Sequence, residues 1–307
     1  MLILPQEFID RVRSTFAPSG AGWLATLPER IATYAERWEV RIGAPFADLS
    51  YNLALQATCA DGTAAVLKLG VPCAELRTEI AALTLYGGNG AVKLLAADGQ
   101  GGALLLERLL PGTPLRDLGD DDAATVIAAD VMQRLRPAPP PLHSFPSVTD
   151  WFNGLTRLRA EFDGGYGPFP AQMVARAEAL YSELTASAAD PIVLHGDLHH
   201  TNILRSERDG WLAIDPKGVI GEPAYEVGAL LRNPLSLPEW PDLRRRLDRR
   251  ADILCERLGL ERRRVLGWAA AQMVLSAWWS YEDGGPGADW RRWLSVAEVL
   301  FGLAGDR

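Results

Sequence analysis

Two carboxylates and a carboxamide that could carry out chemistry lie close together between residues 193 and 218. Asp197 and Asn202 stand five residues apart, and Asp215 follows in the same stretch. One carboxylate can accept a proton, while an amide oxygen and a second carboxylate are the hard ligands that Mg²⁺ prefers. Phosphoryl transfer uses such a set, because the protein contributes mainly position and charge to that reaction. The pattern therefore indicates a phosphoryl-transfer site with Asp197 as the base and Asn202 and Asp215 as metal ligands.

Three of the four histidines of the chain lie in the same stretch. His195 stands two residues before Asp197, so we expect it in the catalytic site, where it orients the loop rather than transferring protons. His199 and His200 are adjacent, which points their side chains in different directions, and no third soft ligand accompanies them. The pattern therefore does not indicate a zinc site.

Short apolar runs on either side position these residues. Residues 192–194, 203–204 and 212–214 are apolar and short, which is typical of buried strands. The polar residues between them are therefore expected at strand ends.

A lysine at residue 68 is a second candidate. Only three of the 31 Lys and Arg residues are lysines, and Lys68 ends the strand-like segment A-A-V-L-K. A compact ammonium at a strand end can contact nucleotide phosphates where a guanidinium would not fit. The helical segment that follows carries Glu75 and Glu79, and either could pair with Lys68. We favour Glu79, because Glu75 lies at the helix start, where the helix dipole alone would explain an acid.

The segment G-A-P-F-A-D-L-S-Y-N, which begins at Gly43, lies between the first two expected strands. It lacks the G-x-G-x-x-G pattern, so phosphate contacts would come from backbone amides near Ser50, Tyr51 and Asn52. A plain hairpin loop explains the segment nearly as well.

The first third of the chain reads as a sheet preceded by a helical extension. Residues 1–40 are expected to be helical, because large apolar side chains recur at helical spacing at Trp23, Leu27, Ile31, Tyr34 and Trp38. The later periodicity predicts three antiparallel strands, a helix and two more strands, at residues 40–46, 51–59, 63–69, 74–86, 91–96 and 103–107.

After residue 110 strands nearly disappear, which predicts a boundary between a nucleotide-binding part, residues 1–110, and a helical catalytic and substrate-binding part, residues 111–307. Helices are expected at about 121–136, 150–162, 171–188, 223–232, 241–258, 261–282 and 289–304. The apolar run 268–279 is too short to cross a bilayer and is interpreted as a buried core helix.

Composition narrows the class of protein. The 307 residues are 48% hydrophobic and carry a net charge of −8, which argues against nucleic acid as the main partner and permits a cationic ligand. Three unevenly spaced cysteines indicate neither a disulfide framework nor a zinc site, so a reducing cytoplasm is the expected location. No signal peptide or membrane contact is expected.

Several segments of the chain resemble the aminoglycoside phosphotransferase family of small-molecule kinases. They are A-V-L-K at 65–68, L-L-L-E-R-L at 104–109, H-G-D-L-H-H-T-N at 195–202, I-D-P-K-G at 214–218 and G-E-P-A-Y-E at 221–226. The resemblance runs from about residue 40 and is strongest to the streptomycin kinase branch, which includes hydroxyurea kinases. It implies an α+β, protein-kinase-like fold of two lobes, with an antiparallel sheet in the N-terminal lobe and a mainly helical C-terminal lobe.

The resemblance also implies a role for each matching position. These roles are Asp197 as catalytic base, Asn202 and Asp215 as magnesium ligands, Lys68 and Glu79 as the phosphate-positioning pair, and Glu107, Arg108 and Leu109 as the adenine-binding linker. Two positions depart from relatives. Pro216 follows the metal aspartate where protein kinases have Phe, and Glu226 stands where many family members have an Asp that braces the catalytic loop.

The expected function is transfer of the γ-phosphoryl group of ATP, with Mg²⁺, to a hydroxyl of a small and cationic molecule. A streptomycin-like aminoglycoside, and hence antibiotic resistance, is the leading acceptor; hydroxyurea or another metabolite is the alternative. Acidic and aromatic side chains could hold the acceptor's cation, although a Trp pair is often simple packing; these candidates are Glu226, Trp279, Glu282 and Asp283. A nucleotide-binding pseudokinase is the rival class, against which the intact Lys68, Asp197, Asn202 and Asp215 argue.

Overall fold

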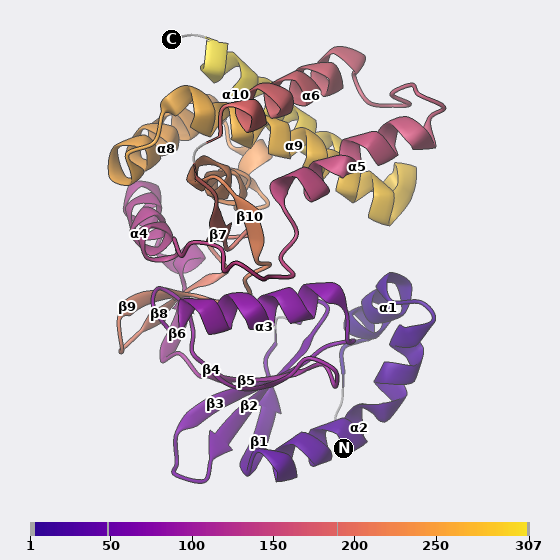
Figure 1. Ribbon diagram of the computed structural model, residues 1–307, viewed down its shortest axis with the longest axis vertical. Helices are drawn as coiled ribbons and strands as arrows, with labels where there is room; N and C mark the ends of the chain where they lie inside the picture. Colours follow the sequence, from indigo (N-terminus) through magenta and orange to yellow (C-terminus); the bar gives the residue numbers. More distant parts are fainter. Residues whose placement is uncertain (1–3, 48, 189, 306–307) are drawn as a thin grey trace. The chain divides into compact units, whose positions relative to one another are not determined.

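The computed structural model describes residues 4–47, 49–188 and 190–305 (Figure 1). The chain divides into two compact units between Gly112 and Thr113, two residues after the expected boundary.

The first unit is built around a five-stranded antiparallel sheet. Its strand order is β1-β2-β3-β5-β4, with β1 (Val40–Pro45), β2 (Leu53–Cys59), β3 (Ala64–Leu69), β4 (Leu94–Asp98) and β5 (Ala103–Glu107). All five expected strands are present, although residues 51–52 and 91–93, expected as strand starts, precede β2 and β4. Ala91 forms an isolated β-bridge, and Ala91 and Val92 are both buried, so these residues pack in the interior without extending β4.

Alternation along the strands separates the two faces of this sheet. Leu67 and Leu69 of β3 lie in a core with α1 (Gln6–Thr15) and α2 (Ser19–Arg37). Lys68 points to the opposite face, which α3 (Ala74–Tyr86) covers (Figure 1). The apolar stripe of α2 packs as predicted, with Trp23, Leu27 and Tyr34 buried.

The helical extension is two helices rather than one. The helices α1 and α2 meet at residues 16–18, where Pro18 lacks the backbone N–H that an uninterrupted helix needs.

The second unit is mainly helical. Its helices are α4 (Asp121–Arg134), α5 (Val148–Glu161), α6 (Ala171–Ala186), α7 (Val227–Leu231), α8 (Leu243–Leu258), α9 (Arg262–Gly284) and α10 (Arg291–Gly305). The helix expected at 223–232 is a 3₁₀ turn, Pro223–Glu226, followed by the short α7.

Small strands frame the candidate site in this unit. They are β7 (Ile192–Leu194), β8 (Ile203–Ser206), β9 (Gly210–Ala213) and β10 (Val219–Gly221), of which β10 pairs with β7 and β8 with β9. The strand β6 (Pro111–Pro114), next to β8, and β10 were not expected, because both are short and contain Gly or Pro.

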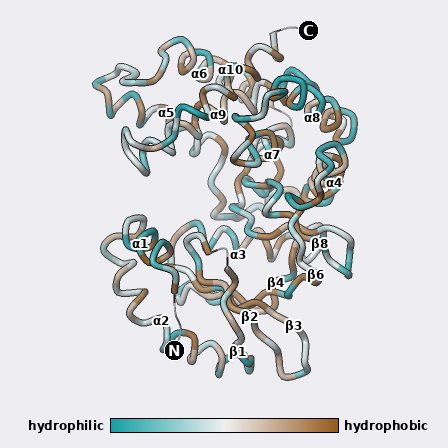
Figure 2. Tube along the Cα trace, turned by 180° about the vertical axis from the view of Figure 1, so that it is seen from behind, coloured by the Kyte–Doolittle hydropathy of each residue, from teal (hydrophilic) through white to brown (hydrophobic). Residues whose placement is uncertain are grey.

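The helix α9 forms the core of the second unit. Fourteen successive residues, 265–278, are buried, which confirms the expected core helix. The helix α8, in contrast, is hydrophilic over much of its length (Figure 2). Among the described residues, no helix combines the length and apolarity needed to cross a membrane.

Candidate active site

The loop between β7 and β8 carries Asp197 and is held by a buried histidine. The backbone N–H of Asp197 donates to Nδ1 of His195 at 3.2 Å, and Nε2 of His195 donates to the carbonyl oxygen of Ile214 at 2.8 Å. Nδ1 accepts and Nε2 donates, which fits one neutral tautomer. His195 therefore ties the loop to the residue that precedes Asp215.

His195 is completely buried, and burial lowers its pKa to about 4, so the ring is neutral near pH 7. Its contacts are those of a positioning residue, and they offer no face to a substrate. The contacts fit the loop-orienting role that the sequence indicated for His195.

The two candidate metal ligands are joined through the backbone. The side-chain amide of Asn202 donates to the carbonyl oxygen of Asp197 at 2.9 Å, and the N–H of Ile214 donates to the carbonyl oxygen of Asn202 at 2.9 Å. The amide nitrogen of Asn202 thus faces the loop, so its oxygen is the atom that could ligate a cation. Asp215 follows directly, with a φ of 59°, a conformation that L-residues rarely adopt.

This donor set fits Mg²⁺. An amide oxygen and a carboxylate oxygen are hard ligands, and the metal usually completes its shell with water and phosphate. A site made entirely of protein side chains is a different case. Within the described ranges, no cluster of three or more His, Cys, Asp and Glu side chains has an arrangement that could hold a metal. His199 and His200 are not joined in such a group: Nδ1 of His199 lies 2.7 Å from Oγ1 of Thr201, and His200 is buried.

The carboxylate of Asp197 has a partner that sequence reasoning missed. Nη2 of Arg232 lies 2.8 Å from Oδ1 of Asp197, and Nε2 of His199 lies 3.7 Å from Oδ2. Burial acts to raise the pKa of Asp197, but His199, Arg232 and Lys217 outweigh it, so the pKa is lowered. Arg232 and Asp197 are 35 positions apart, and no sequence pattern relates residues at that separation, so the sequence did not indicate this contact.

The first unit contains the second candidate cluster. Nζ of Lys68 lies 2.6 Å from Oε1 of Glu79, and both side chains are buried. Glu75 is exposed. The structure thus pairs Lys68 with Glu79, the glutamate that lies deeper in the helix.

The segment proposed to contact phosphates is attached to α1. Nη1 of Arg11 donates to the carbonyl oxygens of Leu49 at 3.1 Å and Ser50 at 3.4 Å. The ring of Tyr51 packs edge-on against Phe16, and a side chain at Gly70 would collide with Asn52. These residues form an ordered loop with a conformation set by its neighbours.

The expected adenine linker continues β5. Glu107 and Arg108 donate backbone N–H bonds to Lys93 and Ala64, at 3.0 and 3.1 Å, and the Leu109 side chain is buried. The Arg108 guanidinium points back into the sheet, to Gln56 at 2.9 Å.

Comparison with known proteins decides the family. The family model described as "Aminoglycoside/hydroxyurea antibiotic resistance kinase" matches residues 37–284. The chain belongs to this family.

Relatives match along nearly the whole chain. A streptomycin 6-kinase of Streptomyces griseus is 34% identical over 92% of both chains, and a hydroxyurea phosphotransferase of Kitasatospora aureofaciens is 34% identical over 98% of this chain and 87% of its own. The family resemblance is confirmed, and the protein is a small-molecule O-phosphotransferase.

The fold agrees with this membership. An aminoglycoside phosphotransferase solved in a ternary complex with ADP and hygromycin B superposes with a TM-score of 0.61 at 14% identity, over 90% of this chain and 98% of that one. The expected α+β, two-lobe, protein-kinase-like fold is confirmed.

In this family member, the Glu226 carboxylate contacts the loop that carries Asp197. The carboxylate accepts the N–H of His195 at 2.7 Å and that of Gly196 at 3.0 Å. The residue is 5% exposed, and these contacts favour the bracing role over a contact with the acceptor. The resemblance implied an aspartate at this position in many family members. The side chain of Glu226, which is one methylene longer, also reaches the loop.

The pH dependence of thermal stability tests the protonation state of Glu226. Burial, opposed by the backbone hydrogen bonds, raises its pKa from 4.5 to about 7. Between these two pH values the folded protein keeps a proton that the unfolded chain loses, so stability falls as pH rises. Relative to Glu226→Gln, the wild-type Tm is expected to fall by about 2–5 °C between pH 5 and 8. Differential scanning calorimetry would contradict this if the two Tm curves stayed parallel.

The expected acceptor contacts lie around the end of α9. Trp279 packs edge-on against Trp151, which in turn lies against Gly196 of the catalytic loop. Glu282 is already paired with a cation, since Arg157 donates to both its oxygens at 2.7 and 2.9 Å. Partial burial and Glu282 raise the pKa of Asp283. Arg157 therefore neutralises Glu282. Trp279 is the candidate that the structure connects, through Trp151, to the loop that carries Asp197.

Proposed function

We propose that the protein is an ATP- and Mg²⁺-dependent kinase that transfers the γ-phosphoryl group to a hydroxyl of a small molecule. The observation that carries the proposal is the geometry around Asp197. A partly exposed carboxylate stands on a loop held by His195, Asn202 and Glu226, and Asp215 is tied to that loop through Ile214.

The proposed chemistry gives each group one task. Asp197 accepts the proton of the acceptor hydroxyl. The oxygen of that hydroxyl attacks the γ-phosphorus of ATP, and ADP leaves. Asn202 and Asp215 would hold Mg²⁺, which supplies neutralisation of phosphate charge when bound. Lys68, oriented by Glu79, contributes a point charge for the nucleotide phosphates.

The nucleotide contacts proposed for the first unit are mainly backbone contacts. The amides near Ser50, Tyr51 and Asn52 would serve the phosphates, and the segment Glu107–Leu109 would serve the adenine. The loop's attachment to Arg11 and the extension of β5 into the linker support these roles.

A streptomycin-like aminoglycoside is the first acceptor proposed, because the relatives include a streptomycin 6-kinase. Hydroxyurea is a second candidate, and one observation favours it. Glu282, which was expected to hold a cation, is neutralised by Arg157, and this reduces the need for a cationic acceptor.

An acceptor screen tests the proposal. ADP release is measured in a coupled assay with Mg·ATP and, separately, streptomycin, other aminoglycosides, hydroxyurea, amino alcohols and sugars. We expect acceptor-dependent ADP release that EDTA abolishes, with a product that mass spectrometry identifies as the phosphorylated acceptor. Binding of Mg·ATP without acceptor-dependent release would instead identify a nucleotide-binding scaffold. Release with hydroxyurea and not with streptomycin would choose the second candidate.

A further inference from the structure

Arg232 and Asp197 form a mostly buried ion pair in the second unit. The side chains are 20% and 23% exposed. The attraction within a mostly buried ion pair is offset by the desolvation of both charges, so the pair by itself is weak evidence for a role in stability. The contact is therefore better explained by its effect on the Asp197 carboxylate.

Arg232 completes a set of contacts that fixes Asp197. The backbone N–H of Asp197 is held by His195, and its carbonyl oxygen by Asn202. Rotation of the carboxylate is restricted by Arg232, which bonds Oδ1 at 2.8 Å. The other oxygen, Oδ2, is 3.7 Å from His199, beyond hydrogen-bond distance. Oδ2 is thus the oxygen suited to accept a substrate proton.

Arg232 is itself held from two sides. Its Nη1 donates to Oγ of Ser276 on α9 at 2.8 Å, while its backbone N–H donates to the carbonyl oxygen of Gly228 at 3.0 Å. Because both ends of the residue are anchored, the guanidinium has a defined position next to the carboxylate.

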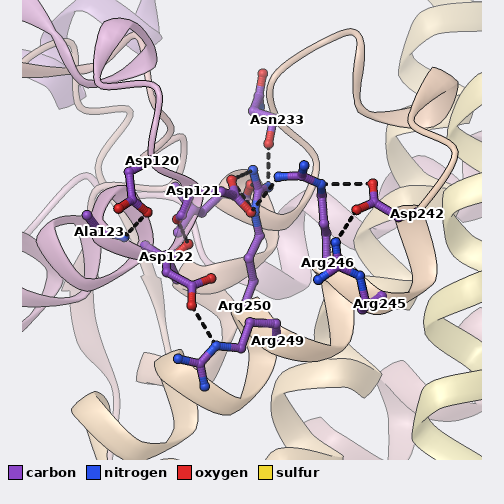
Figure 3. A network of polar contacts seen from close by, with 12 residues as sticks. Asp120, Asp121, Asp122, Ala123, Asn233, Asp242, Arg245, Arg246, Arg249 and Arg250 are labelled. Atoms are coloured by element: carbon purple, nitrogen blue, oxygen red, sulfur yellow. Dashed lines mark hydrogen bonds and ion pairs between the residues drawn. The ribbon is translucent and has the colours of Figure 1, made fainter.

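The backbone on either side of Arg232 is fixed by a buried arginine, Arg250, which Figure 3 shows with Asn233 and Asp121. Arg250 is fully buried, and its Nη1 donates to the carbonyl oxygens of Leu230 at 3.3 Å and Asn233 at 2.6 Å. Asp121 of α4 balances its charge, with Nε of Arg250 3.1 Å from each carboxylate oxygen. A buried charge satisfied in this way is costly to disturb, so the turn that carries Arg232 is rigid.

We propose that Arg232 is a positioning residue for phosphoryl transfer, which holds Oδ1 of Asp197 so that Oδ2 receives the proton of the acceptor hydroxyl. The inference rests on the proposed function and assigns to Arg232 a role in orientation. Small displacements of a catalytic group reduce rates strongly, so the pair should affect turnover more than binding.

Kinetics of Arg232→Ala test the inference. The kcat is expected to fall about tenfold, while the KM for ATP and the Kd for Mg·ATP change less than about twofold. Added guanidine is expected to restore part of the kcat, since it can enter the space that the side chain leaves; a structural role would not respond. Arg249→Ala is the matched control, because Arg249 is an exposed α8 arginine paired with Asp122, and its kcat should equal that of the wild type.

A double variant of Arg232 and Asp197 gives a second test of the inference. In an Asp197→Asn background, Arg232→Ala should lower kcat less than about twofold, because the carboxylate it positions is already gone. Wild-type kcat in Arg232→Ala, or the same tenfold loss in both backgrounds, would overturn the inference. If the alanine variant does not fold, Arg232→Lys replaces it; a partial loss of kcat is expected, and an unchanged kcat overturns the inference.

Wild-type turnover is measured first and separates the two proposals. Its absence with every acceptor would overturn the proposed function and this inference together. Wild-type turnover with an unaffected Arg232 variant would overturn this inference alone.

Discussion

Asp197→Asn is expected to lower kcat by about 100-fold or more while the affinity for Mg·ATP changes little. The substitution keeps the size of the side chain and its backbone contacts with His195 and Asn202, but it removes the negative charge and the ability to accept a proton. Steady-state kinetics with the acceptor found in the screen and titration calorimetry with Mg·ATP measure the two quantities.

A matched control is available nearby. Asp209 lies in the turn between β8 and β9, is exposed, and pairs with Arg208. Asp209→Asn should therefore retain wild-type kcat. Turnover near the wild-type level in Asp197→Asn would show that another group accepts the proton.

Lys68→Arg is expected to reduce kcat/KM for ATP by at least about 20-fold, although the charge is kept. Lys68 and Glu79 are 6% and 7% exposed, so the space around the ammonium is limited. A guanidinium is larger and distributes its charge over a plane, and it would displace either Glu79 or the phosphates. Glu79→Gln should produce a similar loss, because it removes the partner that orients the ammonium.

The double variant tests whether the two residues act as one pair. Lys68→Arg/Glu79→Gln should be hardly worse than either single variant, since an interaction that is already broken cannot be broken again. Glu75→Gln is the control, one turn earlier on the same helix, and should have little effect. Losses that multiply across the cycle, or a Glu75 variant as impaired as the Glu79 variant, would contradict the pairing as the functional unit.

The parts of the molecule that could be predicted from the sequence are those that depend on local pattern. Short apolar segments bounded by turn signals predicted β2, β3 and β5, helical spacing predicted α2 and α3, a continuous apolar run predicted the core of α9, and the choice of Glu79 over Glu75 followed from position within a helix. These signals arise from neighbours in the chain, and each element presents its pattern regardless of tertiary contacts.

The parts that could not be predicted depend on contacts between distant segments. Arg232 was indistinguishable from the many other arginines, because only the turn after α7 brings it to Asp197. Arg157 likewise neutralises Glu282 from another helix, α5, which the sequence around Glu282 does not indicate. The strand β10 was missed because three residues with a terminal glycine carry almost no periodicity.

The backbone at Asp215 bears on how this enzyme could be engineered. Its φ of 59° is a conformation that costs most L-residues roughly 1–2 kcal/mol and glycine almost nothing. Backbone strain alone would therefore favour glycine at this position, where the carboxylate is proposed to bind the metal. Backbone strain and the proposed chemistry favour different residues here, so a thermostable version of the protein has to be sought by changes elsewhere, with Asp215 kept fixed.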